Sequence, residues 1–333
     1  MAFNIIHGDI TQVNTESIVL PANPQLFEGP GSSRAIFEAA GRRELTEACA
    51  EIGYCPLGSA VITPGFNLKA KNIIHAVCPR YIDGTHKEAE LLYSAYIESL
   101  KLASANGLKS IAFPLLSAGN YHFPKGEAQD IACKAIRDYL DDLEDELDVE
   151  LVIYDRKDVT VDRGIQKLFE REHRYSEFRM SRSYRNIDSY PTVGSAPFVS
   201  ELENEVCKES VLQPQNIDDI LKEKQQSFRE LLMEYIIRSE LKNSQVYHRA
   251  LITKQVFSNA ISGNGTPKKN TILALALALE LNLEDTEKLL MKAGYAFSDA
   301  SQFDLAIQYF IENKRYNVIE VNINLDALGL PIL

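Results

Sequence analysis

The sequence predicts an α/β fold with a mostly parallel sheet, followed by an all-helical region. Up to about residue 170, short β-branched runs alternate with helical patterns, and this alternation indicates a layered α/β fold. From about residue 225 onward, nearly every stretch spaces its apolar residues as a helix does. A chain of 333 residues is long enough for two ordinary domains. We therefore expect an α/β domain over 1–171 and a helical domain over 225–333.

The segment between these domains, residues 172–224, is rich in Ser, Arg and Tyr and has no sustained period. Such a composition is typical of a linker or an extended arm. Because Tyr and Phe recur in it, a segment that folds over its neighbouring domain is the alternative interpretation.

Strands and helices alternate along the first domain. The strands are expected at 2–6, 16–21, 59–64, 72–77, 110–115 and 150–155. The helices are expected at 32–40, 42–52, 86–106, 125–146 and 161–171. Ligands of such folds collect beyond the carboxyl ends of the strands. The glycine-bearing loops at 28–33 and 117–124 follow strands, so we expect them at that edge of the sheet.

Composition narrows the class of protein. A net charge of −12 argues against nonspecific binding of nucleic acid by the whole surface. The five cysteines form no C-x-x-C pair, which fits reduced thiols and predicts no structural zinc or other metal site. The longest apolar run, 271–281, is too short to cross a membrane, and the first ten residues lack the pattern of a signal peptide. We therefore expect a soluble, cytoplasmic protein with no membrane partner.

The loop "EGPGSS" has the chemistry of an anion site. Gly29 and Gly31 allow a tight turn and a close approach of the backbone, and Pro30 fixes the φ angle between them. Ser32 and Ser33 then begin a helix, whose free N–H groups favour a phosphate. The alternative interpretation is a plain strand-to-helix turn with a serine N-cap and no ligand.

A second loop and one carboxylate favour a nucleotide. The stretch "FPLLSAGNYHFPKGEA" (113–128) again passes from a strand through small residues, 117–120, into a helix. Two such loops on one edge are able to hold a diphosphate from both sides. Asp9, after the first strand, suits an exocyclic amine or a hydroxyl. Together these features indicate a site for a ligand similar to an adenine dinucleotide.

The order and spacing of five stretches over residues 1–170 resemble those of a macrodomain. The stretches are "HGDIT", "ESIVLPAN", "GPGSSRAIFEAAG", "GSAVITPGFNLKAKNIIHAVCPRY" and "FPLLSAGNYHFP". The resemblance implies a three-layer α/β/α fold with a mixed, mostly parallel sheet. It implies that the ligand is ADP-ribose or a derivative, free or on a protein, and that no other cofactor is needed.

The resemblance also implies a role for each motif residue. Asp9 would contact the adenine amino group with Ile10 beside it, and Tyr154 or a neighbouring residue would stack on the adenine. Asn23 and Phe123 would lie near the distal ribose. The diphosphate would be wrapped by the residues of the two loops: Gly29, Gly31, Ser32, Ser33, Ser117, Ala118, Gly119, Asn120 and Tyr121.

Departures from the family pattern favour binding over hydrolysis. Many macrodomains read "NAAN" where this chain reads "LPAN", so only Asn23 remains. The branch that removes mono-ADP-ribose from proteins has a catalytic Asp at the position of Ser33. Losing such a carboxylate typically removes about 10²–10⁴-fold of rate. A second hydrolytic branch uses a Lys and an Asp, for which we find no match.

The remaining catalytic candidates are Asn23 and His122. His122 stands where a glycine is usual in the family. The alternative interpretation of His122 is an exposed loop residue without a catalytic role.

Other reactive residue types have ordinary interpretations. His75 in "NIIHAV" is expected to be a buried strand residue with its hydrogen bonds satisfied. Nothing near Cys55 or Cys78 suggests a lowered thiol pKa.

The second domain is expected to consist of helices at 227–242, 243–251, 253–262, 269–281, 283–295, 301–313 and 317–328. Asn243 or Ser244, and Asn282, are the expected N-caps. The order of helices resembles the DNA-binding domain of regulators of the lambda-repressor type. The whole arrangement resembles an architecture found in Firmicute proteins.

A helix-turn-helix would place the stretch 253–262 on DNA. The candidate nucleic-acid contacts are Thr253, Lys254, Gln255, Ser258 and Asn259. The run 241–279 contains no acidic residue, as such a role requires. However, the candidate recognition helix carries one Lys and no Arg, so a protein-docking or oligomerisation module is the favoured alternative.

The sequence therefore predicts a sensor, in which the first domain binds an ADP-ribose-type ligand and the helical domain transmits the bound state. A mono-ADP-ribosyl protein hydrolase with substrate-held water is the first alternative. A DNA-binding regulator that responds to an NAD-derived ligand is the second. The oligomeric state and the in-cell ligand are not predicted.

Overall fold

The computed structural model describes residues 3–142, 147–155, 159–170, 226–263 and 265–333. Residues 1–165 and 228–333 belong to one compact unit. The description that follows concerns this unit. The arm predicted over 172–224 lies outside the described residues.

The macrodomain-like part contains a six-stranded mixed sheet, as the sequence predicts. The strands are β1 (Phe3–His7), β2 (Ser17–Ala22), β3 (Ala60–Pro64), β4 (Asn72–Val77), β5 (Ser110–Pro114) and β6 (Asp148–Ile153). Their order is β1-β6-β5-β2-β4-β3, and only the pairing of β3 with β4 is antiparallel. The central strands β2 and β4 are buried almost throughout, as expected for a sheet that is covered on both faces.

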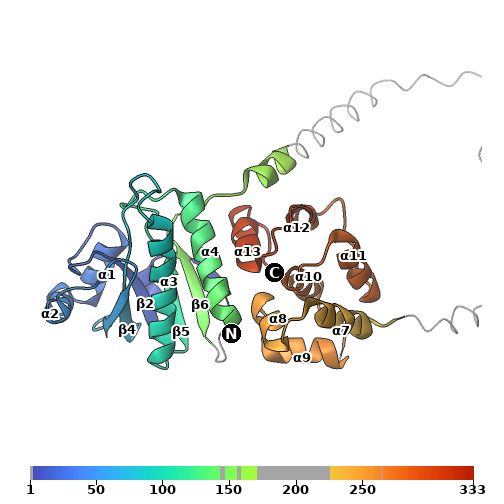
Figure 1. Cartoon of the computed structure of the whole chain (residues 1–333), viewed down its shortest axis with the longest axis horizontal. Helices are drawn as coiled ribbons and strands as arrows, with labels where there is room; N and C mark the ends of the chain where they lie inside the picture. Colours follow the sequence, from blue (N-terminus) through green and yellow to red (C-terminus); the bar gives the residue numbers. More distant parts are fainter. Residues whose placement is uncertain (1–2, 143–146, 156–158, 171–225, 264) are drawn as a thin grey trace, which may run out of the picture. The chain divides into compact units, whose positions relative to one another are not determined.

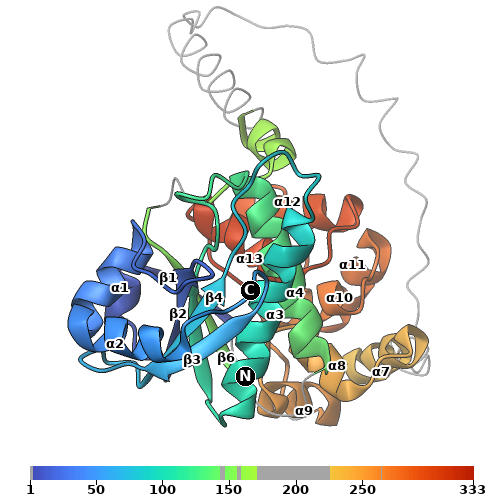
Figure 2. The same cartoon turned by 60° about the vertical axis from the view of Figure 1, so that its left-hand side comes forward.

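Helices cover both faces of this sheet (Figures 1 and 2). The helices are η1 (Ile10–Gln12), α1 (Ser32–Ala40), α2 (Arg42–Ile52), α3 (Glu88–Ala105) and α4 (Lys125–Asp142). Alternate residues of a strand point to opposite faces. Accordingly Ile18 and Leu20 of β2 pack in one core with residues of α1 and α2, while Val19 packs in the other with α3 and α4. The predicted three-layer α/β/α fold is confirmed.

The second part is all-helical, as predicted. Its helices are α7 (Phe228–Ser239), α8 (Asn243–Arg249), α9 (Lys254–Ser262), α10 (Lys269–Ala278), α11 (Leu283–Lys292), α12 (Gln302–Glu312) and α13 (Val318–Ala327). The predicted cap at Asn282 is confirmed, because its side chain accepts the N–H of Asp285 at 2.8 Å. The predicted cap at Asn243 or Ser244 is wrong: Lys242 is the N-cap of α8, and the side chain of Gln245 accepts its N–H at 3.0 Å. Among the described residues, no helix is both long and apolar enough to cross a membrane.

Helix α13 joins this helical domain to the sheet. It lies beside α4 and against β1. Its residues Ile319 and Ile323 are buried in the same apolar core as Phe3 of β1 and Leu151 of β6. The helical domain therefore supplies part of the layer that covers this face of the sheet.

We expect Ile319→Ala to lower the free energy of unfolding of the whole chain by about 2–5 kcal/mol, because it leaves a cavity in this shared core. Ile237→Ala is the matched control. Its side chain is 72% exposed on α7, so a change within about 0.5 kcal/mol is expected. Chemical denaturation measures both. Equal effects of the two substitutions would contradict a shared core.

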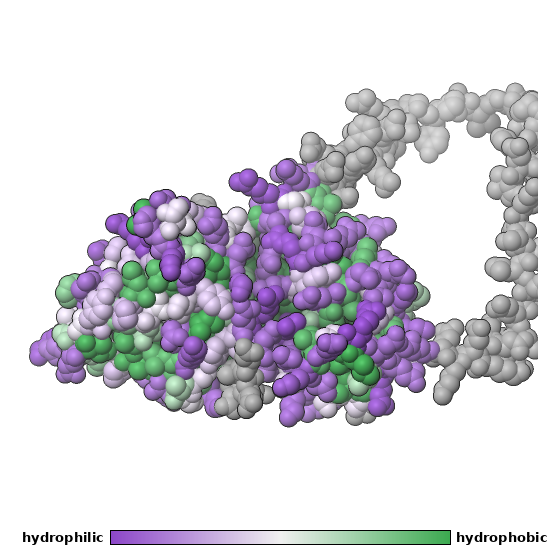
Figure 3. Space-filling model, in the orientation of Figure 1, coloured by the Kyte–Doolittle hydropathy of each residue, from purple (hydrophilic) through white to green (hydrophobic). Residues whose placement is uncertain are grey.

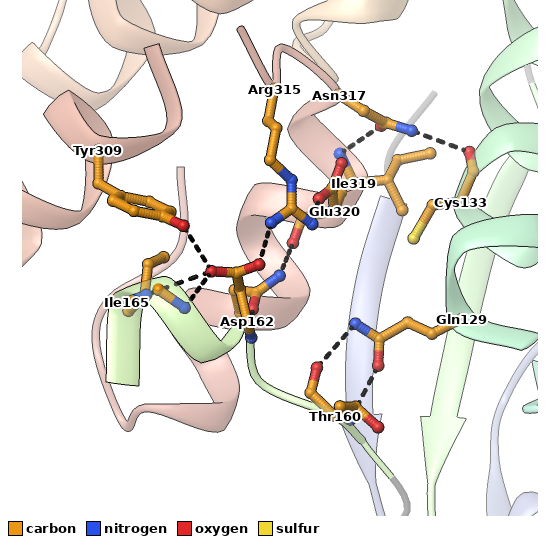
Figure 4. Close-up of polar contacts among 12 residues, drawn as sticks. Gln129, Cys133, Thr160, Asp162, Ile165, Tyr309, Arg315, Asn317, Ile319 and Glu320 are labelled. Atoms are coloured by element: carbon orange, nitrogen blue, oxygen red, sulfur yellow. Dashed lines mark hydrogen bonds and ion pairs between the residues drawn. The ribbon is translucent and has the colours of Figure 1, made fainter. Parts of the chain in front are cut away.

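A polar junction around Asp162 holds the same two parts together (Figure 4). The Asp162 carboxylate accepts a hydrogen bond from the Tyr309 hydroxyl at 2.7 Å and is ion-paired with Arg315. Its backbone N–H donates to the side chain of Asn324 on α13 at 2.8 Å. A Cβ atom on Gly164 would overlap the Tyr309 hydroxyl, so a larger residue there would displace the Tyr309 side chain from Asp162. Burial raises the pKa of Asp162, but these donors lower it more. The pKa of Asp162 therefore lies below its ordinary value.

Two further polar contacts lie along the same boundary. Arg249 of α8 donates to Asp141 of α4 at 2.7 Å. Asp326 of α13 lies 2.7 Å from Nε2 of His7, the last residue of β1. The boundary is thus held by an apolar core with polar contacts at its edges.

Candidate nucleotide-binding cleft

The two glycine-bearing loops meet at the carboxyl edge of the sheet. Gly31 is the N-cap of α1 and has a φ of 71°, a left-handed conformation that favours glycine. A Cβ atom on Gly31 would lie 3.0 Å from Nδ2 of Asn120 in the second loop. Glycine thus suits both the backbone conformation and the close contact with the second loop at this position.

The first loop is held in shape by Ser33. The Oγ atom of this buried side chain accepts the N–H of Gly29 at 3.0 Å. Ser32, one residue earlier, is exposed in the first turn of α1, where the free N–H groups and the helix dipole favour an anion. Ser33 thus fixes the shape of the turn, and Ser32 faces the cleft.

The second loop is held by its own hydrogen bonds. Ser117 has a φ of 62°, and its hydroxyl donates to the carbonyl of Pro79 at 3.0 Å. The N–H of Phe123 donates back to the carbonyl of Ser117 at 3.1 Å. The Phe123 ring is buried edge-on against Tyr81, with ring centroids 5.0 Å apart. Phe123 therefore supports the loop from the core instead of facing the cleft.

Three adjoining cavities form one cleft along these loops, and Ser32 lines all three. The first cavity, of about 400 Å³, lies at the ends of β1 and β6; the second and third have volumes of about 90 and 120 Å³. The predicted residues that line the first are Asp9, Ile10, Gly31, Ser32 and Tyr154. Those that line the second are Asn23, Gly29, Ser32, Ser33, Ser117, Gly119, Asn120 and Tyr121, and Ala118 lines the third. Of the predicted ligand-binding residues, the structure brings all but Phe123 to these three cavities.

The first cavity offers a carboxylate and an aromatic ring. Asp9 accepts the N–H of Thr11 at 2.9 Å, which fixes its side chain at the start of η1. Tyr154 is 81% exposed at the end of β6. The two residues are neighbours across the sheet, since the N–H of Gly8 donates to the carbonyl of Ile153 at 3.1 Å. A flat ring beside Tyr154 that presents an amino group to Asp9 fits this arrangement.

The described residues that line the three cavities include no Lys or Arg, so none of them offers a basic side chain to a ligand. A diphosphate there would be held by backbone N–H groups and by the N-terminus of α1.

The second cavity lacks the usual groups for acid-base catalysis. No carboxylate or imidazole is among its described lining residues. The side chain of Asn23 accepts the N–H groups of Gln25 and Phe27 and donates to the carbonyl of Phe27 at 2.8 Å, so it shapes the loop that follows β2. His122 is exposed with a φ of 55° and lines none of the three cavities. The sequence did not reveal the loop-shaping role of Asn23.

Other reactive side chains are structural, as predicted. Nε2 of buried His75 lies 2.8 Å from the Thr63 hydroxyl, and burial lowers the pKa of His75 to about 4. Burial raises the pKa of Cys78 to about 12 and also raises that of Cys55. Neither thiol is activated as a nucleophile.

One group of side chains in the described residues has the spacing of metal ligands: Asp83, His86 and Glu88. The Glu88 carboxylate already accepts N–H groups of the loop 82–86, which explains its burial. The group therefore acts as a loop cap, and the expectation of no metal stays a prediction.

The first part of the chain is similar in sequence to known proteins. The family model of the Macro domain matches residues 19–132. An O-acetyl-ADP-ribose deacetylase of Escherichia fergusonii is 49% identical over 141 residues, which are 41% of this chain and 79% of that protein. An O-acetyl-ADP-ribose deacetylase of Citrobacter rodentium is 48% identical over 141 residues, with the same coverage. Among solved structures, the Oceanobacillus iheyensis macrodomain with ADP is 34% identical and covers 53% of this chain and 91% of its own, with a TM-score of 0.44.

The fold and the cleft are those of a nucleotide-binding α/β/α domain. The chain belongs to the macrodomain family through its first part. The helical domain lies outside the matched region.

Proposed function

We propose that the macrodomain binds ADP-ribose, or a nucleotide or protein adduct that contains it, and that the helical domain passes the bound state to a partner. The observation that carries the first half is the cleft, in which a carboxylate and an exposed tyrosine lie at one end and two glycine-bearing loops meet in the middle. The names of the curated relatives support the same ligand class.

Binding with slow or no turnover is favoured over efficient hydrolysis. In the described residues, the second cavity offers no carboxylate or imidazole to activate water. The second candidate is a hydrolase of O-acetyl-ADP-ribose or of mono-ADP-ribosylated protein, which the relatives' names favour. Such an enzyme would depend on Asn23 and on water held by the substrate itself.

Calorimetry with ADP-ribose tests the proposal. We expect the whole chain to bind, and Asp9→Ala to weaken binding by about 10- to 150-fold, since a hydrogen bond to a charged group contributes about 1.5–3 kcal/mol. Asp83→Ala is the matched control, because Asp83 accepts the N–H of Thr85 at 2.9 Å in the same local geometry, outside the three cavities. Absence of binding at millimolar ADP-ribose would refute the proposal.

The helical domain is inferred to bind a protein partner. Hydrophobic residues gather in separate patches on the face shown in Figure 3, and Ile237, Val256 and Met291 are exposed in this domain. The DNA-binding alternative, with a domain of the lambda-repressor type, places Lys254, Gln255 and Asn259 on DNA. All three are exposed on α9, but Gln255 and Asn259 are hydrogen-bonded to each other at 3.0 Å. A cytoplasmic location stays a prediction.

A further inference from the structure

Helix α13 reaches the nucleotide cleft from the helical domain. Its Ile323 is only 1% exposed and lines the third cavity, which has a volume of about 120 Å³. Gly119 of the second loop and Tyr154 at the end of β6 line the same cavity. The helical domain thus forms part of the wall behind two residues predicted to contact the ligand.

The same helix also contacts the strand that leads to the other end of the cleft. Oδ2 of Asp326 lies 2.7 Å from Nε2 of His7. His7 directly precedes Gly8 and Asp9, which line the first cavity. A shift of α13 would therefore change the contacts at the ends of both β1 and β6.

A third connection passes through residues 159–162. Val159 and Gln129 line the third cavity, and Gln129 exchanges two hydrogen bonds with the backbone of Thr160, at 3.0 and 3.2 Å (Figure 4). Two residues further on, Asp162 is held by Tyr309 and Arg315 of the helical domain. The wall of this cavity is therefore fixed from α4 on one side and from the helical domain on the other.

We propose that the helical domain is a structural part of the nucleotide site, so that binding of an ADP-ribose-type ligand and docking of α13 onto the macrodomain stabilise each other. This inference rests on the proposed function and explains how ligand binding in the cleft would affect the helical domain. Coupling between two events is reciprocal: whatever docking adds to ligand affinity, the ligand adds to docking. A partner that pulls α13 from the sheet would release the ligand, and a bound ligand would resist the partner.

The chain offers a matched control for this coupling. Tyr309 and Arg315 hold Asp162 at the junction, and neither lines any of the three cavities of the cleft. An equivalent group lies wholly within the helical domain, where Tyr235 and Arg238 hold Asp285 at 3.2 and 2.7 Å. The double variant Tyr309→Phe/Arg315→Met is therefore compared with Tyr235→Phe/Arg238→Met in the full chain.

Calorimetry with ADP-ribose is the main measurement. The junction variant is expected to bind about tenfold more weakly than the wild type, within the range of about 5–150-fold that allosteric coupling typically spans. The control variant is expected to stay within about twofold. A folded junction variant that binds as tightly as the wild type would overturn the coupling and leave the proposed function standing. A wild-type chain that does not bind ADP-ribose would overturn both.

Hydrogen exchange of the wild-type chain keeps the proposal testable if the junction variant fails to fold. Saturating ADP-ribose is expected to slow exchange of the amides in α13 and to leave those in α11 unchanged. Unchanged exchange in α13 with ligand bound would overturn the coupling. Equal slowing in α11 would do the same, because it would show a general effect of ligand on stability.

Discussion

Replacing Gly31 by valine is expected to weaken ADP-ribose binding by at least about 100-fold, a change of about 2.7 kcal/mol. Two effects act together. A residue other than glycine is strained at a φ of 71°, at a cost of about 1–2 kcal/mol. The new Cβ would also lie 3.0 Å from Nδ2 of Asn120, so the valine would crowd the Asn120 side chain where we place the diphosphate. Calorimetry with ADP-ribose measures the loss.

Gly107→Val separates these two effects. Gly107 has a φ of 67° in the turn between α3 and β5, and a Cβ atom there would meet nothing within 4 Å. This control should therefore lower stability through backbone strain and keep its affinity for ADP-ribose. If Gly31→Val bound the nucleotide like Gly107→Val, the meeting of the loops would not be the diphosphate site.

The order of elements in the macrodomain was predictable because its signals are local. The strand at 72–77 and the helix at 32–40 have the expected bounds, since a short β-branched run and a glycine turn mark them directly. The family motifs likewise place Asp9 and Ser117 at one cleft, because both follow parallel strands of the same sheet.

The attachment of the helical domain was not predictable in this way. Ile319 and Ile323 are spaced four residues apart, which indicates a buried helix face but not what covers it. The hydrogen bond of Asp162 with Tyr309 joins residues 147 positions apart, and nothing near either residue indicates the other. Phe123 shows a related limit, because its motif position predicted a place near the ribose while its ring packs against Tyr81 in the core.

The largest change in activity is expected from Ser33→Asp. Ser33 lines the second cavity and stands where the branch that removes mono-ADP-ribose from proteins would have its catalytic carboxylate. The new side chain keeps an acceptor for the N–H of Gly29, which the Ser33 hydroxyl now accepts at 3.0 Å, so the turn should persist. With a carboxylate to position and deprotonate water, we expect hydrolysis of O-acetyl-ADP-ribose to rise about 10²-fold, the lower end of the effect of a general base. Acetate release under single-turnover conditions measures it.

Ser33→Asn is the matched control, because the amide has nearly the same shape and no basic oxygen. The difference between the two variants isolates the carboxylate from any change in the loop. Ser32→Asp adds the same charge one residue earlier, in the exposed first turn of α1. It should repel the diphosphate and weaken binding without raising turnover, since the anion then lies where the phosphates are held. Equal rates for Ser33→Asp and Ser33→Asn would show that the missing carboxylate is not what limits hydrolysis. Rapid turnover by the wild-type chain would instead identify it as an enzyme whose catalytic groups lie elsewhere in the cleft.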